Sequence, residues 1–113
     1  MLVIYTIMID LARVEGFEWD EGNSRKSADR HGVSQAEAEQ VFLNEPLLAE
    51  DDKHSLSEAR FRALGQTDSG RRLHVTFTLR GEGRLVRVIS ARDMNKKERV
   101  SYERQAQGDP DVR

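Results

Sequence analysis

Residues 73–79, LHVTFTL, alternate between hydrophobic and polar side chains, which is the pattern of a half-buried β-strand. Two flanking segments, 60–67 and 85–91, are also predicted to be strands. Short polar or glycine-containing connections at 68–71 and 81–83 separate the three segments, and connections of this length join antiparallel neighbours. We therefore expect an antiparallel meander. Its core face should carry Leu73, Val75, Phe77 and Leu79.

Two helices are predicted before this meander. The first covers residues 21–30, with Asp20 as its cap, and it ends at Gly32, which suits the left-handed position after a helix. The second follows the capping box Ser34-x-x-Glu37 and ends near residue 44, before a proline.

A third helix is predicted after the meander, since Asn95-x-x-Glu98 is a second capping-box pattern and places the helix start at Lys96. Short strands are expected at 17–19, at the sheet edge, and at 47–50. Helices that are separated from the strands along the chain favour the α+β class. The predicted fold is two N-terminal helices, an antiparallel β-meander sheet and a C-terminal helix.

The last strand carries two arginines. Arg87 interrupts an apolar run, and Arg92 is expected to close the strand. Residues five apart lie on opposite faces of a regular strand, so the two guanidinium groups converge only if the strand ends or bulges near Ala91.

The composition indicates one small globular domain. The chain has 113 residues, 37% hydrophobic and 34% charged, and no cysteine, which excludes disulfides, thiolate zinc sites and cysteine nucleophiles. We expect no cofactor and no metal. The absence of cysteine also favours the cytoplasm.

The two ends of the chain are expected to lie outside the domain. Residues 1–16 are interpreted as an extension, in which 1–7 need not be native because Met8 is an alternative start. The apolar run at the N-terminus lacks a basic region and a cleavage site, so it is interpreted as neither signal peptide nor membrane span. The domain is placed at 17–104, and the polar segment 105–113 is expected to be a flexible tail.

Charge is divided unevenly along the chain. Residues 1–58 hold 5 Lys/Arg against 13 Asp/Glu, whereas residues 59–104 hold 12 against 5, so the first part carries −8 and the second +7. A basic half is typical of a surface that meets a polyanion or an acidic partner. A well-mixed folded surface is the alternative.

No phosphate-binding glycine loop, HExxH zinc motif or Ser/His/Asp signature is present. What remains is three histidines, many arginines and the acids Glu50, Asp51 and Asp52. Such residues suit RNA cleavage, because histidine can move protons near neutral pH and arginine holds phosphate oxygens with two hydrogen bonds.

Each candidate also has a structural interpretation. His31 can satisfy the last carbonyls of its helix, His54 can be a loop residue, and His74 can be polar surface opposite the core. Arg60 and Arg87 can pair with acids from the first half of the chain.

Several ordered motifs together resemble the BrnT toxin family. The match is collinear over residues 17–104 and is carried by FEWD (17–20), RHGVS (30–34), DDKHS (51–55), ARF (59–61), ALG (63–65), RVISAR (87–92), ER (98–99) and YE (102–103). The ordered series is more specific than any one of its pieces.

The resemblance implies a ribonuclease toxin of a type II toxin–antitoxin system with a RelE-like fold. It implies a BrnA-type protein antitoxin as partner, which would also carry the DNA binding, and RNA as substrate. Carried over onto this chain, the expected catalytic residues are His31, Arg60, Arg87, Arg92 and His54. The expected RNA-binding residues are Lys96, Lys97, Arg99 and Tyr102.

The roles that follow from the resemblance are specific. His31 would be the general acid or base, Arg60 and Arg87 would hold the scissile phosphate, and Arg92 with the helix at 96–99 would follow the RNA backbone. The leading hypothesis is a metal-independent endoribonuclease that inhibits translation. The alternatives are a catalytically silent protein that binds nucleic acid or a partner, and a metal nuclease that uses Asp51 and Asp52.

Overall fold

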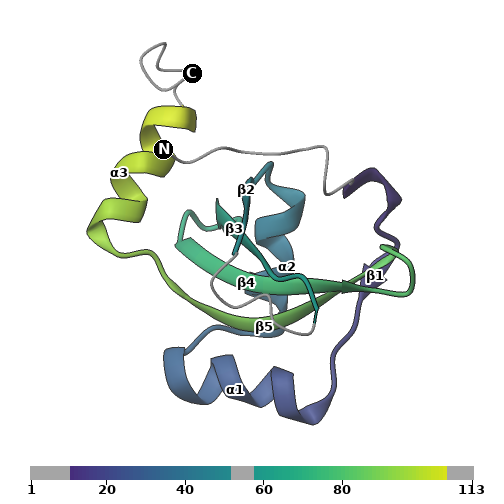
Figure 1. Ribbon diagram of the computed structural model, residues 1–113. Coiled ribbons are helices and arrows are strands. Elements are labelled where there is room, and N and C mark those ends of the chain that lie inside the picture. Colours follow the sequence, from purple (N-terminus) through teal and green to yellow (C-terminus); the bar gives the residue numbers. More distant parts are fainter. Residues whose placement is uncertain (1–10, 52–57, 107–113) are drawn as a thin grey trace.

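The computed structural model describes residues 11–51 and 58–106, so the expected catalytic residue His54 and the expected tail after residue 106 lie outside the described residues. The described chain forms one five-stranded sheet with three α-helices around it (Figure 1). The elements are a 3₁₀ turn at Leu11–Arg13, β1 (Gly16–Phe17), α1 (Glu21–His31), α2 (Gln35–Leu43), β2 (Leu47–Glu50), β3 (Phe61–Gln66), β4 (Arg72–Arg80), β5 (Leu85–Asp93) and α3 (Lys96–Ala106).

The sheet has the strand order β1-β5-β4-β3-β2. Strands β2 to β5 are antiparallel neighbours, so the predicted meander is confirmed and is extended by β2. The short first strand also lies at the sheet edge as expected, but it pairs parallel to β5, which makes the sheet mixed. The predicted α+β class is confirmed.

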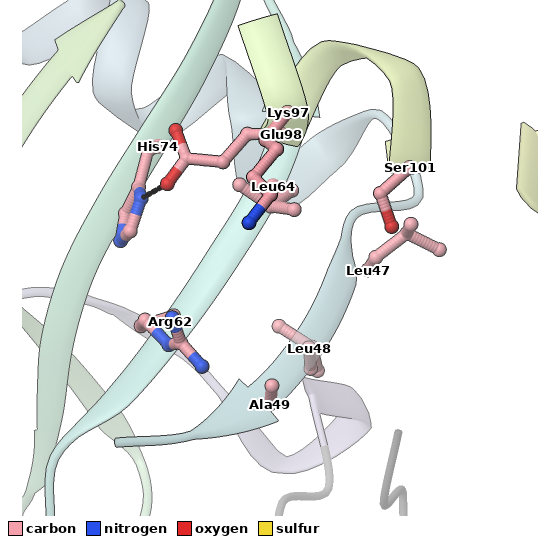
Figure 2. Close-up of a pocket in the computed structure, with 9 residues that line it drawn as sticks. All are labelled: Leu47, Leu48, Ala49, Arg62, Leu64, His74, Lys97, Glu98 and Ser101. Atoms are coloured by element: carbon pink, nitrogen blue, oxygen red, sulfur yellow. Dashed lines mark hydrogen bonds and ion pairs between the residues drawn. The ribbon is translucent and has the colours of Figure 1, made fainter. Parts of the chain in front are cut away.

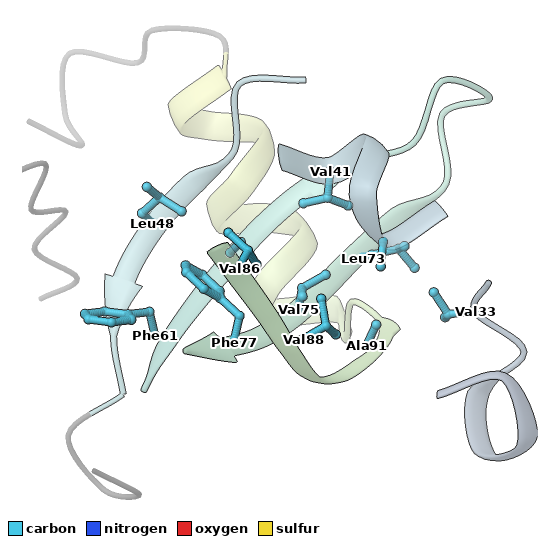
Figure 3. Close-up of a cluster of buried hydrophobic side chains, with 12 residues drawn as sticks. Val33, Val41, Leu48, Phe61, Leu73, Val75, Phe77, Val86, Val88 and Ala91 are labelled. Carbon is cyan, nitrogen blue, oxygen red and sulfur yellow. The ribbon is translucent and has the colours of Figure 1, made fainter. Parts of the chain in front are cut away.

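The hydrophobic core lies on one face of the sheet (Figure 3). Leu73, Val75 and Phe77 have no exposed surface, and Leu79 packs against them from the edge of the cluster, as the alternation predicts. Helix α2 packs on this face over β3 and β4, whereas α1 packs against β5. Helix α3 meets the opposite face near one end of the sheet, where Glu98 of its first turn contacts His74 of β4 (Figure 1).

The predicted helix ends are confirmed. Ser34 and Glu37 form the capping box of α2, and Gly32, with φ of 64°, ends α1 in the left-handed region. Asn95 and Glu98 form the same reciprocal pair of hydrogen bonds at α3, which begins at Lys96. Residues 105 and 106, which were expected to belong to the tail, are the last two residues of α3.

Asn23 joins α1 to the outer edge of β5. Its side-chain amide is buried and donates to the backbone carbonyls of Val88 and Glu18, at 3.0 and 3.1 Å. Its side-chain oxygen accepts from the backbone N–H of Asp20, and the Asp20 carboxylate accepts from the backbone N–H of Asn23. A helix cap thereby also satisfies backbone groups of a strand that has no full-length neighbour on this side.

A β-bulge interrupts β5. Thr76 pairs with Ser90 whereas Phe77 pairs with Val88, so Ile89 is an extra residue in β5. The strand was expected to end at Ala91, but it continues to Asp93. The bulge changes the alternation, and Arg87 and Arg92 therefore lie on the same face of the sheet, the one opposite the core.

Gly65 is expected to be required by packing. A β-carbon at this residue would lie 2.9 Å from Val41 Cγ1 and 3.3 Å from Pro46 Cβ, and Val41 is fully buried. Gly65→Ala should lower the free energy of unfolding by about 1–3 kcal/mol through overpacking. Urea denaturation measures this, and Gly16→Ala is the control, since its nearest atom is 3.8 Å away. Equal effects of the two substitutions would contradict this account of Gly65.

Candidate active site

The sheet face opposite the core, which we call the open face, carries polar residues in rows across three strands. In one row His74 of β4 lies between Leu64 of β3 and Arg92 of β5. In the next row Thr76 lies between Arg62 and Ser90. These rows place one imidazole between arginines that come from both neighbouring strands.

His74, Arg92 and Glu98 form a hydrogen-bonded cluster where α3 meets the sheet (Figure 2 shows His74 and Glu98). The Glu98 Oε2 atom lies 2.8 Å from His74 Nδ1 and 3.0 Å from Arg92 Nη2. The Oε1 atom accepts from Arg92 Nη1 at 2.9 Å and from the Asn95 amide at 3.0 Å. Both carboxylate oxygens therefore have two donors each.

The charge of Glu98 is maintained by these donors. Burial alone would raise the pKa of the carboxyl group, but hydrogen bonds from Arg92, the Asn95 backbone and His74 lower this pKa to about 2. Glu98 is therefore a carboxylate throughout the neutral range.

The His74 Nδ1 atom has two neighbours at 2.8 Å: Glu98 Oε2, which only accepts, and Arg92 Nη2, which only donates. The tautomer with its hydrogen on Nδ1 donates to Glu98 and leaves the lone pair of Nε2 free. Burial lowers the pKa of His74; the bond to Glu98 raises it, and the nearby charges of Arg92 and Arg62 lower it again, with a net decrease. His74 is then neutral near pH 7, and in the tautomer that donates from Nδ1 it can accept a proton at Nε2, which points away from Glu98 (Figure 2).

A hollow next to this cluster collects positive charge. We call it the cation pocket; its lining residues are Lys26, Asp51, Arg60, Arg62, His74, Thr76, Ile89, Ser90 and Arg92. Arg62 forms no ion pair with any described residue, and its Nε atom is buried without a hydrogen-bond partner. A guanidinium in this state suits an anionic ligand that supplies the missing acceptors.

Two of the arginines expected from the sequence, Arg60 and Arg92, line the cation pocket. Arg87 shares their face of the sheet but lies outside the pocket. It donates to Glu18 Oε1 at 3.0 Å and to Asp20 Oδ2 at 2.9 Å. Arg87 therefore pairs with acids from the first half of the chain, as its structural interpretation predicted.

His31 is not among the residues that line the cation pocket. It is exposed at the end of α1, where Arg71 rather than the His31 ring caps the helix by donating to the carbonyls of His31 and Gly32. Arg71 is chiefly responsible for the lowered pKa of Asp93, and His31 contributes less. His31 thus belongs to the cluster around Arg71.

The expected RNA-binding residues lie on α3. Lys96, Lys97 and Arg99 are exposed, whereas Tyr102 is only 6% exposed and does not present its ring to a ligand. Lys97 also reaches over Leu64 on the sheet (Figure 2).

The sequence interpretation missed His74 and Arg62. His74 was expected to be polar surface, and this is wrong: it is 7% exposed because the first turn of α3 covers it. Its signal was present, since His74 and Arg62 lie at the polar positions of two adjacent strands. The alternation of polar and hydrophobic residues along a strand does not show that α3 covers His74.

Within residues 11–51 and 58–106, we find no group of three or more His, Cys, Asp or Glu side chains arranged to hold a metal ion. None of the helices in the same residues has the length and hydrophobicity needed to cross a membrane.

Comparison with known proteins agrees with this fold. The family model for the ribonuclease toxin BrnT of type II toxin–antitoxin systems matches residues 19–98. The crystal structure of the Brucella abortus ribonuclease toxin BrnT is similar, with a TM-score of 0.51 and 22% sequence identity over 72% of this chain and 97% of that chain. A search of curated proteins found no match. The chain therefore belongs to the BrnT family and is an endoribonuclease toxin of a type II toxin–antitoxin system, in which a protein antitoxin is its partner.

Proposed function

We propose that this toxin cleaves RNA without a metal ion, and that His74, oriented by Glu98, is the general base. The observation that supports this most is the position of the His74–Glu98 pair beside Arg62, a cation with no counter-ion among the described residues. An imidazole held by a carboxylate is a common arrangement for proton transfer.

The chemistry follows from the geometry. His74 Nε2 takes the proton of a ribose 2′-hydroxyl, and the 2′-oxygen attacks the adjacent phosphorus. The bond from phosphorus to the 5′-oxygen breaks, and that oxygen takes a proton from water. The hydroxide left behind takes the proton back from His74, and the products are a 2′,3′-cyclic phosphate and a 5′-hydroxyl. Arg62 and Arg60 hold the phosphate and stabilise its added negative charge, whereas Arg92, whose two Nη atoms donate to Glu98, keeps that carboxylate in place.

The rest of the molecule suits a single-stranded polyanion. Lys26 extends the cation pocket from α1, and the exposed Lys96 and Arg99 continue the positive charge along α3. We assign Arg87 to the structure, because Glu18 and Asp20 already neutralise it. His31 and His54 are not needed in this scheme.

The cellular setting follows from the family. We propose that the partner is a BrnA-type antitoxin, that DNA is bound only through this antitoxin, and that the toxin inhibits translation in the cytoplasm by cleaving RNA there.

His74→Ala should reduce cleavage of single-stranded RNA by about 10²–10⁴-fold, the usual contribution of a general base. The assay uses purified toxin freed of antitoxin, with EDTA present. Circular dichroism and urea denaturation check that the variant folds. Wild-type cleavage that requires an added divalent ion would contradict the metal-free mechanism, and RNA binding without any cleavage would indicate the silent binding protein instead.

Arg62 and Arg87 provide a matched pair of substitutions. Arg62→Gln should lower kcat/KM on the order of a hundredfold, since a phosphate-stabilising charge is removed. Arg87→Gln should change it by less than about threefold, because its charge is already paired. A larger loss in Arg87→Gln, in a variant as stable as wild type, would instead support the role that the family resemblance implied for Arg87.

The pH profile of kcat/KM tests the base. Its acidic limb should lie below the ordinary histidine value of about 6.5, because the pKa of His74 is lowered. Removing a nearby cation favours the imidazolium, so Arg62→Gln should move the limb to higher pH. Removing the carboxylate disfavours it, so Glu98→Gln should move the limb to lower pH. Shifts in the same direction would contradict the assignment of His74 as the base.

A further inference from the structure

A second hollow lies between α3 and the strands β2 and β3, with a volume of about 530 Å³ (Figure 2). We call it the helix pocket; it is lined by Leu47, Leu48, Ala49, Arg62, Leu64, His74, Lys97, Glu98 and Ser101. Its volume is in the range of about 300–1,000 Å³ that is typical of small-ligand sites. The cleavage chemistry proposed above uses Arg62, His74 and Glu98 of this lining but places no group of the substrate in the hollow itself.

The helix pocket adjoins the cation pocket. Arg62 and His74 line both hollows, so a group held in one lies next to the group held in the other. A nucleotide whose phosphate contacts Arg62 in the cation pocket can therefore place its base in the helix pocket.

The two hollows differ in chemistry. Side chains of β2 and β3 give the helix pocket an apolar floor, which includes Leu47, Ala49 and Leu64, whereas the cation pocket is polar. A flat aromatic base gains free energy when its faces leave water for such a floor. Unpaired bases of single-stranded RNA are available for this kind of burial.

The polar groups at the rim are mainly hydrogen-bond donors. Lys97 reaches over Leu64 and forms no ion pair with any described residue, and Arg62 lies at the opposite end (Figure 2). Ser101 adds a hydroxyl, which can donate or accept. The Glu98 carboxylate is not available as an acceptor, because each of its oxygens already accepts two hydrogen bonds.

We propose that the helix pocket is a base subsite: it holds the unpaired nucleobase next to the scissile phosphate and prefers a keto base, guanine or uracil. Keto oxygens accept hydrogen bonds from Lys97 and Arg62, as lysine and arginine donate to guanine in the DNA major groove. The amino groups of adenine and cytosine meet donors instead. This inference rests on the proposed ribonuclease function.

The test uses DNA oligonucleotides that contain one ribonucleotide, and therefore one cleavable linkage. The base on each side of that linkage is guanine, uracil, adenine, cytosine or absent. Wild-type toxin should cleave the substrate with a keto base at one of these positions about fivefold or more faster than its adenine, cytosine or abasic counterpart. Fluorescence anisotropy with all-deoxy versions measures the same preference as binding, without cleavage.

Two substitutions address the subsite itself. Lys97→Met should reduce the keto preference to less than about twofold, because the donor is lost. Lys96→Met is the matched control: it removes the same charge from the same helix, but Lys96 does not line the helix pocket, so the overall rate falls while the preference stays. Ser101→Phe, which fills the pocket, should bring the rate on base-containing substrates down to the rate of the same variant on the abasic substrate.

The outcomes separate this inference from the proposed function. If base-containing and abasic oligonucleotides are bound and cleaved equally, the subsite is wrong, while cleavage that depends on His74 still supports the ribonuclease mechanism. If no oligonucleotide is cleaved but binding prefers keto bases through Lys97, the subsite is supported and the proposed mechanism fails.

Discussion

The carboxylate of Glu98 is the group on which the candidate site and the C-terminal helix both depend. It closes the capping box of α3 through the Asn95 amide, and it accepts hydrogen bonds from Arg92 and His74. A buried carboxylate is costly unless it is fully hydrogen-bonded, and here four donors compensate for its burial. One carboxylate therefore both caps a helix and contacts the imidazole of the candidate site.

The distribution of ion pairs decides which arginines remain available to a ligand. Acids from the first half of the chain pair with Arg71, Arg80 and Arg87, which removes much of the −8 and +7 contrast between the two halves. Arg62 has no such partner among the described residues. The positive potential of the open face thus has a local source in Arg62, whose charge no described residue neutralises.

Local patterns predicted much of this fold because their causes are local. Alternation along residues 73–79 reports which side chains are buried, and the capping boxes at Ser34 and Asn95 satisfy backbone groups within one turn. Long-range facts were not available in this way. The burial of His74 depends on α3 folding back over β4, and the pairing of Arg87 depends on acids almost 70 positions earlier.

The bulge at Ile89 was only partly predictable from the sequence. The interpretation of the sequence recognised that Arg87 and Arg92 share a face only if β5 is irregular, but an extra residue leaves no clear mark in composition.

The capping box at Asn95 and Glu98 has a consequence for how the toxin loses activity. Local unfolding that starts at the first turn of α3 separates Glu98 from His74 at the same moment, although the core on the other face of the sheet is untouched. The free energy needed to open one helix end is thus an upper limit on the stability of the assembled site. Fraying of a single turn, rather than global denaturation, would be the first inactivating event.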